Sequence, residues 1–218
     1  MLKDLIRFPG ILKSTKRFTK YWQNRHTEKG FDWKTAYLDG WQHPHRYMIV
    51  EILKKFKWHS LLEIGCASGP NLHLIKQAFP QSKLGGMDVS KEAIKVASQN
   101  LHKDIHLDVG SAYEGFLSDN SCDVILTDMT LIYVDDIKRA LKEFKRLSGR
   151  AVVLCEFHSK SWWKRLALRL ATGYRARDYK TLLEKEGFWD INLYKIPEQL
   201  WPGGEPQRSY GYVITARI

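Results

Sequence analysis

A short loop with two glycines carries the residues best suited to hold a ligand. It reads LLEIGCASGPN, and its spacing is set by Glu63, Gly65 and Gly69. Glycine lets the backbone turn sharply and lets a ligand approach it closely. The spacing is neither that of a dinucleotide loop nor that of a phosphate loop ending in Lys and Ser or Thr. The acidic residue ahead of the loop would repel a pyrophosphate, so it favours a cationic ligand.

A second carboxylate, Asp88, follows nineteen residues beyond Gly69. At the end of the next strand, a carboxylate can accept hydrogen bonds from both hydroxyls of a ribose. Together with Glu63, it predicts a site for a nucleoside that carries positive charge and no phosphate.

Alternating strands and helices must position these two carboxylates. Apolar runs typical of buried strands cover residues 59–64, 83–89, 105–107, 122–127 and 151–157. Helical patterns cover residues 45–56, 69–79, 90–101, 135–147 and 177–186. Repeated strand–helix units predict a mainly parallel sheet with helices on both faces. Two terminal strands, 189–195 and 210–218, suggest an antiparallel hairpin at one edge.

These segments resemble the class I S-adenosylmethionine-dependent methyltransferases. The resemblance rests on EIGCASG at 63–69, MDVS at 87–90 and CDVI at 122–125, and it covers roughly residues 59–157. It implies an α/β fold with a Rossmann-like open sheet of seven strands, mostly parallel with an antiparallel last strand. It also implies S-adenosyl-L-methionine as the cofactor and transfer of its methyl group as the reaction.

The resemblance also implies which residues bind the cofactor. They lie in the glycine loop, at the end of the second strand, and after the third and fourth strands: Glu63, Gly65, Cys66, Ala67, Gly69, Asp88, Val89, Asp108, Ser111, Asp128 and Met129. The sequence departs from the family pattern at two positions. Ala67 stands where many members have a glycine, which narrows the loop. Ser111 replaces the aspartate that commonly meets the adenine amino group, and Asp108 could substitute for it.

Candidate catalytic side chains follow the fourth and fifth strands, where ligands sit in open α/β sheets. They are Asp128, Tyr133, Glu156 and His158. His158 is the best candidate for a general base because imidazole titrates near neutral pH. A local hydrogen bond in a loop is the simpler interpretation of His158. Asp128 could orient the cofactor or cap a turn.

Two further histidines, His43 and His45, flank Pro44 ahead of the first long helix. They could roof the pocket, although a surface loop is the simpler interpretation. The sequence has no H-E-x-x-H motif, so we expect no metal site.

The net charge of +11 is concentrated in two segments. Residues 1–30 hold eight basic and two acidic side chains, and residues 158–180 hold seven basic and one acidic, so each has a net charge of +6. We therefore predict a basic N-terminal helical extension over 1–42. We predict a methyltransferase domain over 43–218, with a basic amphipathic insertion at about 158–180.

The insertion contains SKSWWKRLALRLA, in which Trp162, Leu166 and Leu170 share one face of a helix. Three interpretations stay open: a lid over the acceptor pocket, a helix lying on an anionic membrane, or an RNA-binding element. The leading hypothesis is methyl transfer to a small or medium-sized acceptor, which could be lipid- or sugar-linked. The alternatives are an RNA methyltransferase and a methyltransferase-like domain that binds without catalysis.

The three cysteines, Cys66, Cys122 and Cys155, form no C-x-x-C pair. Their odd number and spacing predict free thiols rather than disulfides or a zinc site. The sequence contains no apolar run long enough to span a bilayer. We therefore expect a cytoplasmic protein, which could contact a membrane peripherally.

Overall fold

The computed structural model describes residues 20–24, 43–113, 117–201 and 206–218. Most of the predicted N-terminal extension lies outside these residues. Within it, residues 20–24 are helical.

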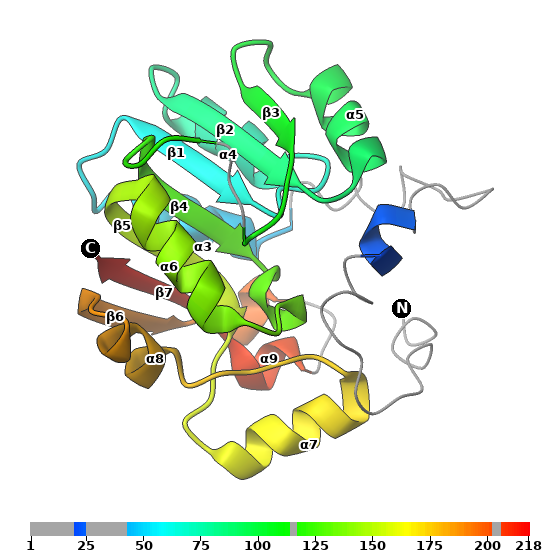
Figure 1. Ribbon diagram of the computed structural model, residues 1–218, viewed down its shortest axis with the longest axis vertical. Coiled ribbons are helices and arrows are strands. Elements are labelled where there is room, and N and C mark those ends of the chain that lie inside the picture. Colours follow the sequence, from blue (N-terminus) through cyan, green and yellow to red (C-terminus); the bar gives the residue numbers. More distant parts are fainter. Residues whose placement is uncertain (1–19, 25–42, 114–116, 202–205) are drawn as a thin grey trace.

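One sheet of seven strands forms the centre of the described part of the chain (Figure 1). Its strands are β1 (Ser60–Ile64), β2 (Lys83–Asp88), β3 (His106–Val109), β4 (Cys122–Asp128), β5 (Ser148–Phe157), β6 (Trp189–Lys195) and β7 (Gly211–Arg217). Their order across the sheet is β3-β2-β1-β4-β5-β7-β6. Only β7 runs antiparallel to its neighbours, β5 and β6. The predicted fold class and the terminal hairpin are confirmed.

Helices cover both faces of this sheet (Figure 1). Besides residues 20–24, the α-helices of the described residues are α3 (His45–Leu53), α4 (Pro70–Ala78), α5 (Lys91–Asn100), α6 (Ile137–Leu147), α7 (Trp162–Thr172), α8 (Tyr179–Lys185) and α9 (Gln207–Tyr210). Short 3-10 turns are η2 (Leu131–Tyr133) and η3 (Glu198–Leu200). One core layer contains apolar side chains of α3, α4 and α5, and the other contains those of α6 and α8.

The central strand β4 has buried side chains on both faces of the sheet, so a layer of helices has to cover each face. Val124 and Leu126 are buried in the layer of α3 and α4, whereas Ile125 is buried in the layer of α6. Successive side chains of a strand point to opposite faces, so an unbroken apolar run is buried on both sides.

Several predicted boundaries shift by a few residues. The helix expected over 177–186 begins at Tyr179, because the Asp178 carboxylate accepts a hydrogen bond from the Thr181 N–H and caps it. The fifth strand begins at Ser148 rather than at residue 151, because the chain passes directly from α6 into β5.

The predicted insertion contains the helix α7, which lies apart from the sheet in Figure 1. The Ser161 hydroxyl accepts a hydrogen bond from the Lys164 N–H at its start, and Gly173 ends it in a left-handed conformation. Leu168 is the one residue of this helix that is buried. No helix among the described residues combines the length and the apolar character that crossing a bilayer requires.

Candidate active site

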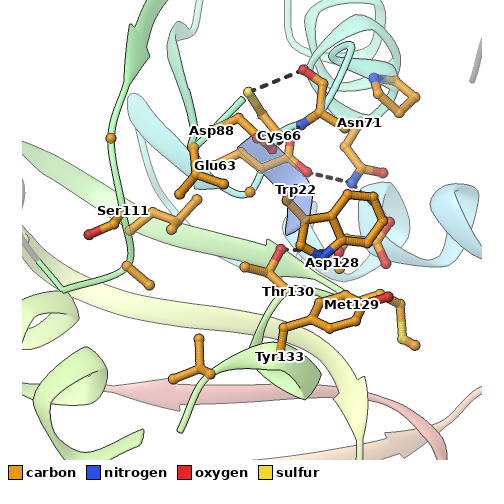
Figure 2. A pocket seen from close by; sticks show the side chains of 18 of the residues that line it. Trp22, Glu63, Cys66, Asn71, Asp88, Ser111, Asp128, Met129, Thr130 and Tyr133 are labelled. Atoms are coloured by element: carbon orange, nitrogen blue, oxygen red, sulfur yellow. Dashed lines mark hydrogen bonds between the residues drawn. The ribbon is translucent and has the colours of Figure 1, made fainter. Parts of the chain in front are cut away.

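A pocket of about 300 Å³ lies at the carboxyl ends of β1, β2 and β4 (Figure 2). The strand order reverses between β1 and β4, and this is where ligands bind in open α/β sheets. The structure brings most of the predicted site residues to this pocket: Glu63, Gly65, Cys66, Ala67, Asp88, Val89, Ser111, Asp128, Met129 and Tyr133.

Glu63 is a buried carboxylate, and among the described residues only one of its two oxygens has a hydrogen-bond partner. Its Oε1 accepts a hydrogen bond of 2.7 Å from Asn71 Nδ2, as Figure 2 shows. Its Oε2 is also buried and has no hydrogen-bond partner among the residues that the structure describes. Burial raises the pKa of Glu63 to about 8, despite the opposing effect of Asn71. A cationic donor beside Oε2 would satisfy this oxygen and favour the ionised carboxylate.

Asp88 holds the glycine loop at the end of β2. Its Oδ2 accepts a hydrogen bond of 2.9 Å from the Ala67 N–H, and its Oδ1 accepts one of 2.9 Å from the Ser90 N–H. The loop is also held from β2, because the N–H groups of Gly65 and Cys66 both donate to the Met87 carbonyl. Burial raises the pKa of Asp88, and the two hydrogen bonds oppose this shift.

Two residues at the pocket have left-handed backbone conformations that side chains rarely adopt. Ala67 has φ +49° and Met129 has φ +54°. The Ala67 N–H donates to Asp88, and the Met129 N–H donates to the Cys155 carbonyl at 2.8 Å. These bonds hold the loops in conformations that cost about 1 kcal/mol each. The alanine in place of the family's glycine is therefore accommodated.

Asp128 is the centre of a buried polar cluster. Its Oδ2 lies 2.6 Å from Arg46 Nη1, 3.0 Å from His45 Nε2 and 3.1 Å from Asn71 Nδ2. Burial alone would raise the pKa of Asp128, but His45 and Arg46 outweigh it and hold this pKa far below its ordinary range. A carboxylate with so low a pKa is a poor proton acceptor at neutral pH. We infer that Asp128 orients Arg46 and Asn71 rather than acting as a base.

His45 connects this cluster to Trp201, an aromatic residue outside the pocket lining. Its ring stacks on Trp201 with 4.6 Å between centroids, and its Nδ1 lies 2.7 Å from His43 Nδ1. His45 is buried, so the surface-loop interpretation of this residue was wrong, and the alternative that it meets the pocket is correct. The reason is the hydrogen bond between His45 Nε2 and the carboxylate of Asp128, a residue 83 positions away.

Another part of the pocket lining is aromatic. Trp22 lines it and packs edge-on against Tyr133 with 5.2 Å between centroids (Figure 2). Tyr133 packs in turn against Tyr174 at 5.7 Å. Trp22 comes from the helical residues 20–24, so part of the basic N-terminal segment reaches the pocket.

His158 was predicted as a catalytic base, but the structure does not place it at the pocket. It is buried beyond the end of β5, where its Nδ1 accepts a hydrogen bond of 3.2 Å from the Tyr179 N–H. Burial lowers the pKa of His158. This imidazole satisfies an N–H at the start of α8, which is the local structural role that the simpler interpretation assigned to it.

Glu156 also serves the loop after β4. Its Oε1 accepts hydrogen bonds from the Thr127 hydroxyl and from the N–H groups of Thr130 and Leu131, at 2.9 to 3.0 Å. Burial raises the pKa of Glu156 to about 7. The residue does not line the pocket, and it positions the segment that does.

Two predicted cofactor-binding residues lie outside the pocket lining. Asp108 is at the edge of the sheet, where its Oδ2 lies 2.7 Å from His106 Nε2, so the structure does not support it as an adenine contact. Gly69 instead begins α4 at φ +88°, where an added Cβ would lie 2.4 Å from Leu101 Cδ1. It shapes the loop by allowing this close packing.

Sequence reasoning missed Arg46, Asn71 and Trp22 as pocket residues. Asn71 could have been predicted, because it is the last residue of the loop LLEIGCASGPN. Arg46 directly follows His45, but only the folded chain brings α3 against the end of β4. For Trp22 the sequence gave no signal that it meets the pocket.

One group of possible metal ligands occurs among the described residues. Ligand atoms of His45, Asp128 and Cys155 lie within 4.8 Å of one another. The Asp128 carboxylate already pairs with the Arg46 guanidinium, and burial raises the pKa of the Cys155 thiol well above its ordinary value. A bound cation would compete with Arg46, so we assign no metal there.

The buried carboxylates predict a pH dependence of stability. Glu63 and Glu156 have pKa values of about 8 and about 7 when folded, against an ordinary value of 4.5. The folded state therefore binds more protons, and the free energy of unfolding falls as pH rises from about 4.5 through about 8. We expect Glu63→Gln and Glu156→Gln each to weaken this fall. Denaturant unfolding at about pH 5 and about pH 9 checks it. If the free energy of unfolding falls with pH as steeply in both variants as in the parent protein, the prediction is wrong.

The sheet order and the site define a class of protein. The resemblance implied three features: an acidic residue at the end of β1 before a glycine loop, a second acid at the end of β2, and a pocket at the switch point. They define a class I S-adenosylmethionine-dependent methyltransferase fold.

Comparisons with known proteins agree with this class. Residues 62–152 match the family described as a methyltransferase domain. A solved S-adenosylmethionine-dependent methyltransferase of Thermotoga maritima superposes with a TM-score of 0.62 at 19% identity, over 85% of this chain and 96% of that chain. Residues 62–152 therefore form a methyltransferase-family domain, and the described part of the chain has the fold of the class I S-adenosylmethionine-dependent methyltransferases.

Two curated relatives match half of the chain. A malonyl-acyl-carrier-protein O-methyltransferase of Bacillus cytotoxicus is 26% identical over 113 residues, and a demethylmenaquinone methyltransferase of Thermotoga maritima is 28% identical over 112 residues. Each match takes in 50% of this chain, and the matches cover 40% and 48% of these relatives. The chain thus matches less than half the length of either relative.

Proposed function

We propose that this chain binds S-adenosylmethionine in the described pocket and transfers its methyl group to a small or medium-sized acceptor. The observation that carries the proposal is the buried Glu63 Oε2, which lacks a partner among the described residues and lies at a glycine loop. An ammonium group is the kind of donor that such an oxygen requires.

The residues present fit this cofactor. Glu63 would hold the amino group of its methionine part, Asp88 would accept hydrogen bonds from the ribose hydroxyls, and Ser111 would lie on the adenine side. When bound, the cofactor supplies a methyl group that its sulfonium makes electrophilic. The chain then has to orient the acceptor and exclude water. Trp22, Met129 and Tyr133 supply a largely apolar wall for that purpose.

Once Glu63 and Asp88 hold the cofactor, the described pocket offers no further carboxylate free to take a proton from the acceptor. Asp128 has a very low pKa and is paired with Arg46, and His158 lies elsewhere. We therefore favour an acceptor whose attacking atom carries an available electron pair at neutral pH, such as a carboxylate or a thiolate. A lipid- or sugar-linked acceptor is compatible with this chemistry.

Calorimetry with S-adenosylmethionine tests cofactor binding. We expect Glu63→Gln and Asp88→Asn each to weaken binding by about tenfold or more, because each neutralises a charge that the ligand would meet. Asp108→Asn is the matched control, since this carboxylate lies outside the pocket, and it should bind like the parent protein. Absent binding by the parent protein, or equal binding by all variants, would overturn the proposal.

Labelled S-adenosylmethionine with fractionated cell extract then identifies the acceptor. Label in a small-molecule or lipid fraction agrees with the proposal, and label in RNA supports the alternative of an RNA methyltransferase. Binding without any labelled product would support a domain that binds the cofactor but does not catalyse.

A further inference from the structure

We propose that α7 and its flanking basic residues form a docking surface for an anionic lipid bilayer. Four large apolar side chains of this helix face solvent. Trp162 is 55% exposed, Trp163 64%, Leu166 40% and Leu170 56%. Exposed apolar side chains that gather in one place mark an interaction surface. Here they form most of one helix face rather than scattered single residues.

The exposed apolar residues occupy one continuous side of the helix. An α-helix turns by about 100° per residue. Five apolar positions therefore fall within an arc of about 140° around the helix axis: Trp162, Trp163, Leu166, Ala167 and Leu170. Leu168 points the opposite way and is the buried residue of α7. The helix is therefore anchored to the protein by one side and presents its broader apolar side outward.

Basic residues border this apolar arc. Lys164 falls at one margin and Arg169 at the other, and both are exposed. Lys160 precedes the helix and is also exposed. Residues 158–180 contain seven basic side chains and one acidic side chain. An apolar helix face with lysine and arginine at its margins is the pattern of helices that lie in the plane of an anionic membrane interface.

The two indoles are arranged for an interface. Trp162 and Trp163 stack with 3.6 Å between ring centroids and 25° between planes. Tryptophan favours the boundary between headgroups and acyl chains, because its ring is apolar and its N–H can still reach water. The stacked pair therefore forms a broad apolar surface at the beginning of the helix.

Hydrogen bonds within the protein hold the first turns of α7 in place. Arg165 Nη1 donates to the Ser159 carbonyl at 2.8 Å and to the Lys160 carbonyl at 2.7 Å. The Tyr210 hydroxyl donates to the Lys164 carbonyl at 3.1 Å. These bonds fix the helix to the end of β5 and to α9, so the apolar side has a defined direction in the free protein.

The anchoring side of α7 connects it to the pocket wall. Leu168 is buried in a small cluster with Ile132, Phe157 and Ala176. Met129 and Tyr133, which line the pocket, pack against the same cluster. A bilayer contacting α7 would lie on the side of this helix that faces away from Leu168, so α7 would stand between the bilayer and this wall of the pocket.

A lipid surface accounts for this face better than the two other interpretations. The residues of α7 do not line the described pocket, so the helix is not its lid. RNA binding would use the basic side chains and could use the indoles. It would leave Leu166 and Leu170 exposed, and around the helix axis these aliphatic side chains fall between the positions of the two tryptophans.

Sedimentation with vesicles tests the proposal on the full chain. We expect binding to vesicles of phosphatidylcholine with phosphatidylglycerol, and weak binding to phosphatidylcholine alone. Trp162→Ala/Trp163→Ala and Lys164→Glu/Arg169→Glu should each weaken binding by about tenfold or more. Trp189→Ala and Lys138→Glu/Lys142→Glu are matched controls, because they change exposed residues of β6 and α6. The controls should bind like the parent protein.

Two further readouts keep the test independent of folding defects and of catalysis. Brominated lipids should quench the tryptophan emission of the parent protein more than that of Trp162→Phe/Trp163→Phe, whose substitutions are conservative. Binding to a single-stranded RNA oligonucleotide is measured in parallel. No binding to anionic vesicles, equal binding by parent and α7 variants, or RNA binding that alone depends on α7 would overturn the proposal. Vesicle binding by a protein that fails to bind S-adenosylmethionine would support it and contradict only the proposed function.

Discussion

Asp128→Ala should destabilise the protein by about 3–5 kcal/mol, the cost of leaving a buried charge without its partner. Arg46 donates to this carboxylate at 2.6 Å, and the side chains of the pair are 17% and 7% exposed. His45 and Asn71 would also lose an acceptor. Denaturant unfolding monitored by circular dichroism measures the loss.

A double-mutant cycle separates the ion pair from general disruption. Arg46→Met/Asp128→Ala should be less destabilised than the sum of its single variants, because it removes both charges of the pair. Asp108→Ala is the control: it removes an exposed carboxylate that also pairs with a histidine, and we expect a loss within about 1 kcal/mol. Additive effects of Arg46→Met and Asp128→Ala would contradict a coupled buried pair.

Gly65→Ala should abolish cofactor binding and lower the melting temperature. The added Cβ would lie 2.0 Å from Thr130 Oγ1 and within 2.8 Å of its Cβ, and the backbone has φ +81°. Both the glycine loop and the segment after β4 line the pocket, so relief of this overlap must move one of them. Calorimetry with S-adenosylmethionine and thermal unfolding measure the two effects.

Gly173→Ala isolates the clash from the backbone strain. Gly173 has φ +78°, and no atom lies within 4 Å of its added Cβ. This variant should lose about 1 kcal/mol from the left-handed conformation alone and retain cofactor binding. If Gly65→Ala behaves like Gly173→Ala, the contact with Thr130 does not control the pocket.

Local patterns in the sequence determine the framework of this protein. The runs 59–64 and 122–127 become β1 and β4 because an apolar segment of that length is buried on both faces of a parallel sheet. Glu63 and Gly65 lie at the end of β1 and Asp88 lies at the end of β2, and the carboxyl ends of parallel strands meet at one edge. Their convergence could therefore be predicted without coordinates.

Tertiary structure decided which histidine belongs to the site. His158 follows a strand end, as Asp128 does, so sequence position favoured it, yet the imidazole bonds to the N–H at the start of α8. His45 precedes β1 and reaches Asp128 across 83 residues. Such a contact depends on how α3 packs on the sheet, and no short-range spacing encodes it.

The same distinction applies to the basic insertion. Its amphipathic helix follows from the spacing of Trp162, Leu166 and Leu170, because an α-helix places such residues on one face. Whether that face is buried or exposed depends on what packs against it. Only the folded chain, which buries Leu168 and turns the two tryptophans outward, decided that this apolar face meets solvent.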